Sequence, residues 1–190
     1  MLNVVVPIAD GIEEMEAIIV VDVFRRVPWK VICAGIKPGI VTASRGVRLV
    51  PDAIWAEIDP LLFDVLVIPG GKAGAEALSR AEQFLEAVRL FMRSGKWVAA
   101  VCAGPLVLQA AGVLAGRRVT CHPDVALAQT KRLKDRVVVD GRLITSQGPG
   151  SSFEFALAII GALEGRAKAA ELAKSMVVNL PKDFFDRIGV

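Results

Sequence analysis

Short apolar runs that alternate with helical patterns constrain the fold of this chain most strongly. Leu2–Val6, Asp64–Ile68 and Val98–Val101 each consist almost wholly of apolar residues. A strand that is apolar at nearly every position, and not only at every second one, is typical of a parallel sheet buried on both faces. We therefore expect an α/β protein with an open, mostly parallel sheet and helices on both faces.

Turn residues and hydrophobic periodicity divide the rest of the chain into further strands and helices. The other expected strands are Lys30–Ala34 and Arg118–Thr120, with hairpins over Val41–Val50 and over residues 137–146. The expected helices are Glu13–Arg26, Glu82–Arg93, Leu106–Ala111, Phe155–Leu163 and Ala167–Met176.

The C-terminal part of the chain carries one helix-start signal and one unassigned aromatic pair. Ser151 and Glu154 have the spacing of a capping box at the start of a helix. No repeat or linker interrupts the chain, so we expect a single domain over residues 1–190 with a tail from about residue 179. The sequence leaves open whether Phe184 and Phe185 in this tail dock on the body of the protein or on a partner.

Composition and cysteine usage favour a cytoplasmic protein. Hydrophobic residues make up 54% of the chain and the mean hydropathy is +0.52, yet no apolar run approaches the ~18 residues of a membrane helix. The surplus of apolar residues suggests sheet strands covered on both faces and a subunit interface. No basic segment precedes the first apolar run, so we expect no signal peptide. Three cysteines without metal-ligand spacing indicate neither a disulfide framework nor a metal site.

The charge pattern does not favour nucleic acid as a specific ligand. The net charge is only +3, and acids and bases alternate along the chain. Lys131–Arg136 is the only basic cluster, and we interpret it as a solvated loop.

Cys102 is the strongest candidate for a reactive residue. It ends the apolar run Val98–Val101 and is followed by the small-residue turn Ala103–Pro105, which opens a helix. A strand-to-helix turn of this kind exposes a nucleophile over the sheet edge, and the helix N-terminus favours thiolate over thiol. The alternative is a buried structural cysteine that closes a strand.

Two further loops are expected at the same edge of the sheet, because ligands of open α/β sheets bind beyond the carboxyl ends of the strands. Pro7–Glu16 carries the acids Glu13, Glu14 and Glu16, and Pro69–Gly74 is rich in glycine. Backbone N–H groups of such a loop can approach a substrate oxygen closely. His122 is the only histidine of the chain and can act as a proton shuttle if it faces Cys102.

Six ordered motifs resemble those of the ThiJ/PfpI superfamily, and within it the DJ-one (Parkinsonism-associated deglycase/glyoxalase) branch. The resemblance runs from Leu2 to about Val178. The motifs are Glu13–Ala17, Ser44–Val47, Val67–Gly71, Ala100–Pro105, Thr120–Pro123 and Thr145–Gly150. The resemblance implies a flavodoxin-like α/β/α sandwich, usually a homodimer, with a reactive cysteine at a nucleophile elbow and no cofactor.

The resemblance also assigns roles to individual residues. It implies that Cys102 is the nucleophile, that Glu16 is the buried acid hydrogen-bonded to its sulfur, and that His122 transfers protons. The residues implied at the reacting oxygen are Gly70, Gly71 and Ala103; those implied at the pocket mouth or dimer interface are Arg26 and Arg45. Ala43 stands where relatives often carry a second, exposed cysteine, so redox signalling through that thiol is not expected.

The Cys102 and Glu16 side chains cannot both ionise easily within hydrogen-bond distance of each other. We therefore expect the pair to share one proton, in a state where protonated Glu16 donates to the sulfur anion. Cys33 and Cys121 are interpreted as structural, with Cys121 also a candidate to resolve an oxidised Cys102.

Two functions from different classes fit these residues. The first is a cysteine enzyme that converts 2-oxoaldehydes such as methylglyoxal and glyoxal to hydroxy acids, or removes early glyoxal adducts, of the glyoxalase or deglycase type. The second is an oxidative-stress sensor or chaperone in which Cys102 is oxidised to a sulfinate. Ala103 stands where the related peptidases carry a histidine, which argues against proteolysis.

Overall fold

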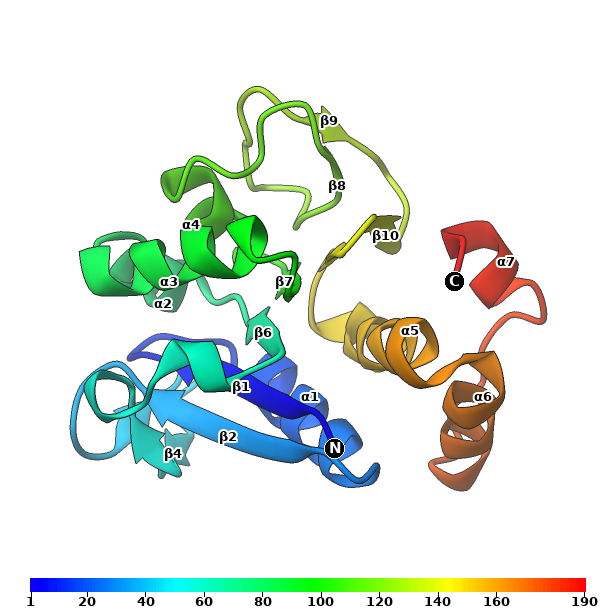
Figure 1. The fold of residues 1–190 in the computed structure, drawn as a ribbon, viewed down its shortest axis with the longest axis horizontal. Coiled ribbons are helices and arrows are strands. Elements are labelled where there is room, and N and C mark those ends of the chain that lie inside the picture. Colours follow the sequence, from blue (N-terminus) through cyan, green and yellow to red (C-terminus); the bar gives the residue numbers. More distant parts are fainter.

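A seven-stranded sheet forms the centre of the protein in the computed structural model, which describes residues 1–190 (Figure 1). Its strand order is β10-β11-β7-β6-β1-β2-β5. The strands are β1 (Asn3–Ile8), β2 (Lys30–Gly35), β5 (Ala53–Ile54), β6 (Val65–Ile68), β7 (Trp97–Val101), β10 (Val137–Asp140) and β11 (Leu143–Ser146). All neighbours are parallel except β10 and β11, which form an antiparallel hairpin at one edge.

Helices cover both faces of the sheet, as the apolar strands predict. Figure 1 shows α2, α3 and α4 on one side and α5 and α6 on the other. The helices are α1 (Glu14–Arg25), α2 (Lys72–Ser79), α3 (Glu82–Arg93), α4 (Pro105–Ala110), α5 (Ser152–Glu164), α6 (Arg166–Ser175) and α7 (Phe184–Ile188). None of them combines the length and the apolar character needed to cross a membrane.

Two apolar cores lie on opposite faces of the sheet. One joins alternate strand residues to α2, α3 and α4, and the other joins the intervening residues to α1, α5 and α6. In β6, Leu66 and Ile68 belong to the first core and Val65 and Val67 to the second, and all four are fully buried. The α/β sandwich inferred from the sequence is thereby confirmed.

Two short sheets lie outside the main one. The expected hairpin over Val41–Val50 is present as β3 (Val41–Thr42) and β4 (Arg48–Leu49), which pair antiparallel. β8 (Arg118–Val119) pairs in parallel with β9 (Lys131–Arg132). The interpretation of Lys131–Arg136 as a solvated loop was therefore wrong in part, because its first two residues form a strand.

The expected capping box of Ser151 and Glu154 is not formed. The Ser151 hydroxyl instead accepts the Gly148 N–H at 3.1 Å, within a short 3-10 helix (Pro149–Ser151), and α5 begins one residue later. The Glu154 carboxylate accepts hydrogen bonds from the Arg136 guanidinium, the shortest at 2.6 Å. Arg136, which directly precedes β10, thus binds the Glu154 side chain in place of the backbone N–H of a capping box.

The C-terminal tail docks on the body of the protein. Phe184, at the start of α7, is 3% exposed and belongs to the same core as α5. A Cβ atom added at Gly161 of α5 would come within 2.8 Å of the Phe185 ring, so the absence of a side chain there makes room for the second aromatic ring. This contact answers the question that the sequence left open.

We predict that Phe184→Ala lowers the free energy of unfolding by about 3 kcal/mol, the usual cost of truncating a buried phenylalanine. Urea denaturation followed by circular dichroism measures this change. The matched control is Phe153→Ala, because Phe153 is 40% exposed, and its cost should stay below about 1 kcal/mol. Equal costs for the two variants would show that the tail contributes no core packing.

Candidate active site

The loops that follow β1, β6 and β7 meet at one edge of the sheet, because these strands are parallel neighbours. Together with the β3–β4 hairpin and the segment after β8 they surround a cleft of about 960 Å³. The lining includes Arg45, Gly71, Lys72, Cys102, Ala103 and His122. The topology thus brings to one cleft the three segments that the sequence placed at this edge.

Cys102 occupies a sharp turn between β7 and α4. Its φ of 62° lies in the left-handed region, which non-glycine residues rarely adopt. Its own N–H donates to the Ser146 carbonyl at 3.0 Å, and its carbonyl accepts the His122 N–H at 3.0 Å. Hydrogen bonds on both sides of the residue hold it in this strained conformation, a combination that is frequent at functional sites.

Glu16 lies beneath Cys102 and is fully buried. One of its carboxyl oxygens, Oε2, accepts the Gly70 N–H at 2.6 Å, and the other, Oε1, has no nitrogen or oxygen partner. A Cβ atom at Gly70 would lie 2.6 Å from the Cys102 Cβ and 2.7 Å from Glu16 Oε2. Only glycine at this position lets the end of β6 approach both side chains so closely.

Burial raises the pKa of both side chains, and repulsion from the Glu16 carboxylate adds to the shift of Cys102. Burial raises the pKa of Glu16 to about 7, against the hydrogen bonds from Cys102 and Gly70. Burial and the facing Glu16 carboxylate raise the pKa of Cys102 to about 12. The two values belong to the pair, which loses one proton near pH 7 and keeps the other far above it.

Two of the three expected backbone donors act on the Cys102 sulfur, and the third does not. The backbone N–H groups of Gly71 and Ala103 act to lower its pKa, but burial and the Glu16 carboxylate outweigh them and the Cys102 pKa stays raised. The third expected donor, Gly70, does not face the cleft. Its N–H is taken by Glu16, so the expectation that it binds a reacting oxygen is corrected. Gly70 instead holds the acid in place.

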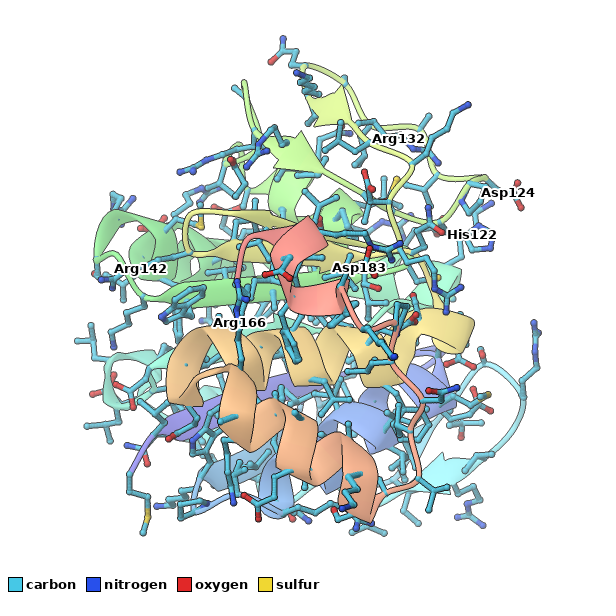
Figure 2. All side chains as sticks on the ribbon, turned by 90° about the vertical axis from the view of Figure 1, so that its right-hand side faces the viewer. His122, Asp124, Arg132, Arg142, Arg166 and Asp183 are labelled. Carbon is cyan, nitrogen blue, oxygen red and sulfur yellow. The ribbon has the colours of Figure 1, made fainter.

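His122 lines the same cleft as Cys102, and its side chain is 41% exposed. Its Nδ1 accepts the Asp124 backbone N–H at 3.2 Å, within a turn closed by a hydrogen bond from Val125 N to the His122 carbonyl. An acceptor at Nδ1 leaves Nε2 as the protonated nitrogen of the neutral ring. Figure 2 shows His122 and Asp124 at one corner of the molecule, with Asp124 directed to solvent.

The two arginines have different positions. Arg45 lines the cleft, and its backbone N–H donates to the buried Glu14 carboxylate at 2.9 Å. Arg26 lies just beyond the far end of α1, where its guanidinium pairs with Asp22 at 2.9 Å, and it does not line the cleft. The pocket-mouth expectation for Arg26 is therefore corrected, because α1 points away from the site after its first turn.

Lys72 is a cleft residue that the sequence did not indicate. It is the first residue of α2, a helix hidden in the sequence by the glycines around it. Gly71, with a φ of 82°, caps this helix, and a Cβ atom there would come within 2.4 Å of the Glu13 backbone. No group of three or more His, Cys, Asp or Glu side chains is arranged to hold a metal ion.

Comparisons with known proteins assign the chain to a family. The model of the DJ-1/PfpI family matches residues 2–162. This chain belongs to the DJ-1/PfpI family. It is 41% identical to Protein DJ-1 homolog B of Arabidopsis thaliana, over 93% of the chain but only 41% of that protein, so it spans about two fifths of that relative.

Other DJ-1/PfpI members match over nearly their whole length. The chain is 40% identical to the glutathione-independent glyoxalase DJR-1.2 of Caenorhabditis elegans, over 86% of this chain and 89% of the relative. The crystal structure of Drosophila melanogaster DJ-1beta has a TM-score of 0.90 and 38% identity, and covers 94% of this chain and 99% of its own. Toxoplasma gondii DJ-1, solved in an oxidised form, has a TM-score of 0.89 at 33% identity, with 95% of this chain and 100% of its own covered.

We predict that the pH profile of Cys102 alkylation depends on the donor at position 16. If the single-proton state is protonated Glu16 beside a thiolate, alkylation by iodoacetamide rises with a midpoint near pH 7. Glu16→Gln keeps a donor for the sulfur and stays reactive, whereas Glu16→Asp is too short and shifts the profile. Cys102→Ser measures the background from Cys33 and Cys121. Identical profiles for the Gln and Asp variants would exclude the proposed hydrogen bond.

We also predict that burial of Glu16 makes stability depend on pH. Between its ordinary pKa of 4.5 and about 7, the unfolded chain releases the Glu16 proton and the folded chain retains it. Stability therefore falls as pH rises through this window, by about 3 kcal/mol relative to Glu16→Gln, which has no group to titrate there. Urea unfolding of both proteins at pH 4 and pH 8 measures the difference, and a constant difference would contradict the raised pKa.

Proposed function

We propose that this protein converts small 2-oxoaldehydes to hydroxy acids by cofactor-independent cysteine chemistry. The observation that carries this proposal is the arrangement of Cys102 on its strained turn, with a buried acid beneath it and the chain's only imidazole in the same cleft. The printed name of the C. elegans relative, a glutathione-independent glyoxalase, supports the same reaction class.

The proposed reaction starts with attack of the Cys102 thiolate on the aldehyde carbon of methylglyoxal, which gives a hemithioacetal. A proton then leaves this carbon and another is added at the neighbouring ketone carbon, through an enediol. The former aldehyde carbon is oxidised to a thioester and the ketone is reduced to an alcohol, so no external oxidant or reductant is needed. Water hydrolyses the thioester to lactate and restores the thiol.

The residues around the sulfur divide this work. His122 carries the proton between the two carbons, since it is the only imidazole in the cleft and an imidazole can both take up and release a proton. Glu16 holds the proton that it shares with Cys102. The N–H groups of Gly71 and Ala103 stabilise the anionic sulfur. Arg45 and Lys72 lie at the cleft wall, where they attract the carboxylate of the product.

The alternative is a sensor function in which peroxide oxidises Cys102 to a sulfinate. The donors that stabilise a thiolate would also bind sulfinate oxygens, and the oxidised form of the Toxoplasma relative favours this second candidate. Small aldehydes or glycated adducts are the proposed partners in the first case. In both cases a homodimer remains a prediction.

We predict that the wild-type protein forms lactate from methylglyoxal and that Cys102→Ser abolishes this activity. His122→Ala should lower kcat by about 100-fold, the typical contribution of a general acid or base. Enzymatic assay of lactate measures both effects. Cys121→Ser is the matched control: Cys121 is buried and precedes His122 in the chain, and this variant should leave kcat within about twofold.

Absence of lactate formation by the wild type would overturn the enzyme proposal and leave the sensor as the better explanation. Full activity in His122→Ala would show that another group carries the proton. In that case Cys102 would still be the nucleophile, provided that Cys102→Ser is inactive.

A further inference from the structure

Arg132 holds the turn that carries His122. Its guanidinium donates to three of the four carbonyls of residues 122–125: to His122 O at 2.9 Å, to Pro123 O at 3.1 Å and to Val125 O at 2.8 Å. Arg132 forms no ion pair with a carboxylate. All the side-chain hydrogen bonds of Arg132 therefore go to residues 122–125. This role differs from the solvated loop that we expected for the basic cluster Lys131–Arg136.

The strand that carries Arg132 is fixed against the strand that leads into His122. Arg132 is the register partner of Val119, and Leu133 N donates to Val119 O at 2.8 Å. Three residues after Val119 the chain reaches His122. β9 thus gives the guanidinium a fixed base beside the turn, and Figure 2 shows Arg132 and His122 at the same corner of the molecule.

The turn over residues 122–125 fixes the imidazole of His122. The carbonyl of His122 accepts hydrogen bonds both from Arg132 and from Val125 N, the bond that closes the turn. The closed turn presents the Asp124 N–H to Nδ1 of His122 at 3.2 Å. A donor at Nδ1 requires the lone pair on that nitrogen, so the proton of the neutral ring lies on Nε2.

We propose that Arg132 is a positioning residue for the active site, which sets the tautomer and orientation of His122 through the backbone of residues 122–125. This inference rests on the proposed role of His122 in proton transfer. Hydrogen bonds from a guanidinium to carbonyls are charge-assisted, and the planar fork satisfies several acceptors at once. Arg132 itself does not line the cleft and touches no reacting atom.

The experiment compares Arg132→Gln and Arg132→Lys with Arg117→Gln as the matched control. Arg117 lies beside β8, its side chain is 42% exposed, and it makes only a 3.6 Å ion pair with Asp140. The control removes the same charge next to the same small sheet but leaves the turn intact. Lysine at position 132 keeps the charge but can reach fewer carbonyls. Arg132→Lys should therefore retain part of the function that Arg132→Gln loses.

The first measurement is turnover of methylglyoxal. Arg132→Gln should lower kcat by about tenfold and change KM by less than about twofold, because a displaced proton carrier slows the chemical step without removing binding contacts. Arg117→Gln should match the wild type. Arg132→Lys should fall between them.

The second measurement does not depend on activity. Since the chain has one histidine, its two ring nitrogens give an unambiguous pair of ¹⁵N NMR signals in labelled protein. At alkaline pH the wild type should show widely separated signals, one for unprotonated Nδ1 and one for protonated Nε2. In Arg132→Gln the two signals should move toward each other as the tautomers mix.

The proposal requires both results. A slower kcat with unchanged nitrogen signals would mean that Arg132 acts by another route, and unchanged kcat with altered signals would mean that the tautomer is not used; either would overturn it. If the wild type itself does not turn over methylglyoxal, the proposed function fails. The nitrogen signals then decide alone whether Arg132 positions His122.

Discussion

The hydrogen bond from Gly70 N–H to the Glu16 carboxyl is the contact on which the site depends. It joins the end of β6 to the first turn of α1, directly beneath the turn that carries Cys102. Because this contact is fully buried, water cannot screen the acid from the thiol. This burial raises the pKa of both groups, and the proposed chemistry of the cleft depends on which of them holds the remaining proton.

The sheet was predictable because its strands are apolar on both faces. A short run of apolar residues such as Val65–Ile68, with helices before and after it, is typical of a buried strand. The helix α2 was not predictable in the same way. Its first turn contains Gly74, where the backbone packs against Ile12, and a Cβ atom would come within 2.7 Å of the Ile12 backbone. Local propensity suggests a loop there, and a tertiary contact makes it a helix.

The candidate site was predictable where residues end neighbouring strands. Cys102 and the acids at the start of α1 could be placed at one edge from topology alone, and the role of Glu16 came from a resemblance that the comparisons support. What sequence could not show was which polar groups partner each other across the fold. The Gly70 N–H can donate one hydrogen bond, and only the structure shows that Glu16 accepts it. The link from Arg132 to the His122 turn is equally non-local.

The small β8–β9 sheet gives the two halves of the site different local stabilities. Cys102 follows β7, a central strand with neighbours on both sides, whereas His122 follows a strand pair of two residues each, outside the main sheet. Segments held by so few backbone hydrogen bonds open without global unfolding. On heating, the imidazole segment should therefore exchange its amide hydrogens and leave the cleft before the sheet melts. The Cys102 sulfur would then persist, for a range of temperatures, in a folded protein whose proposed proton carrier has left the cleft.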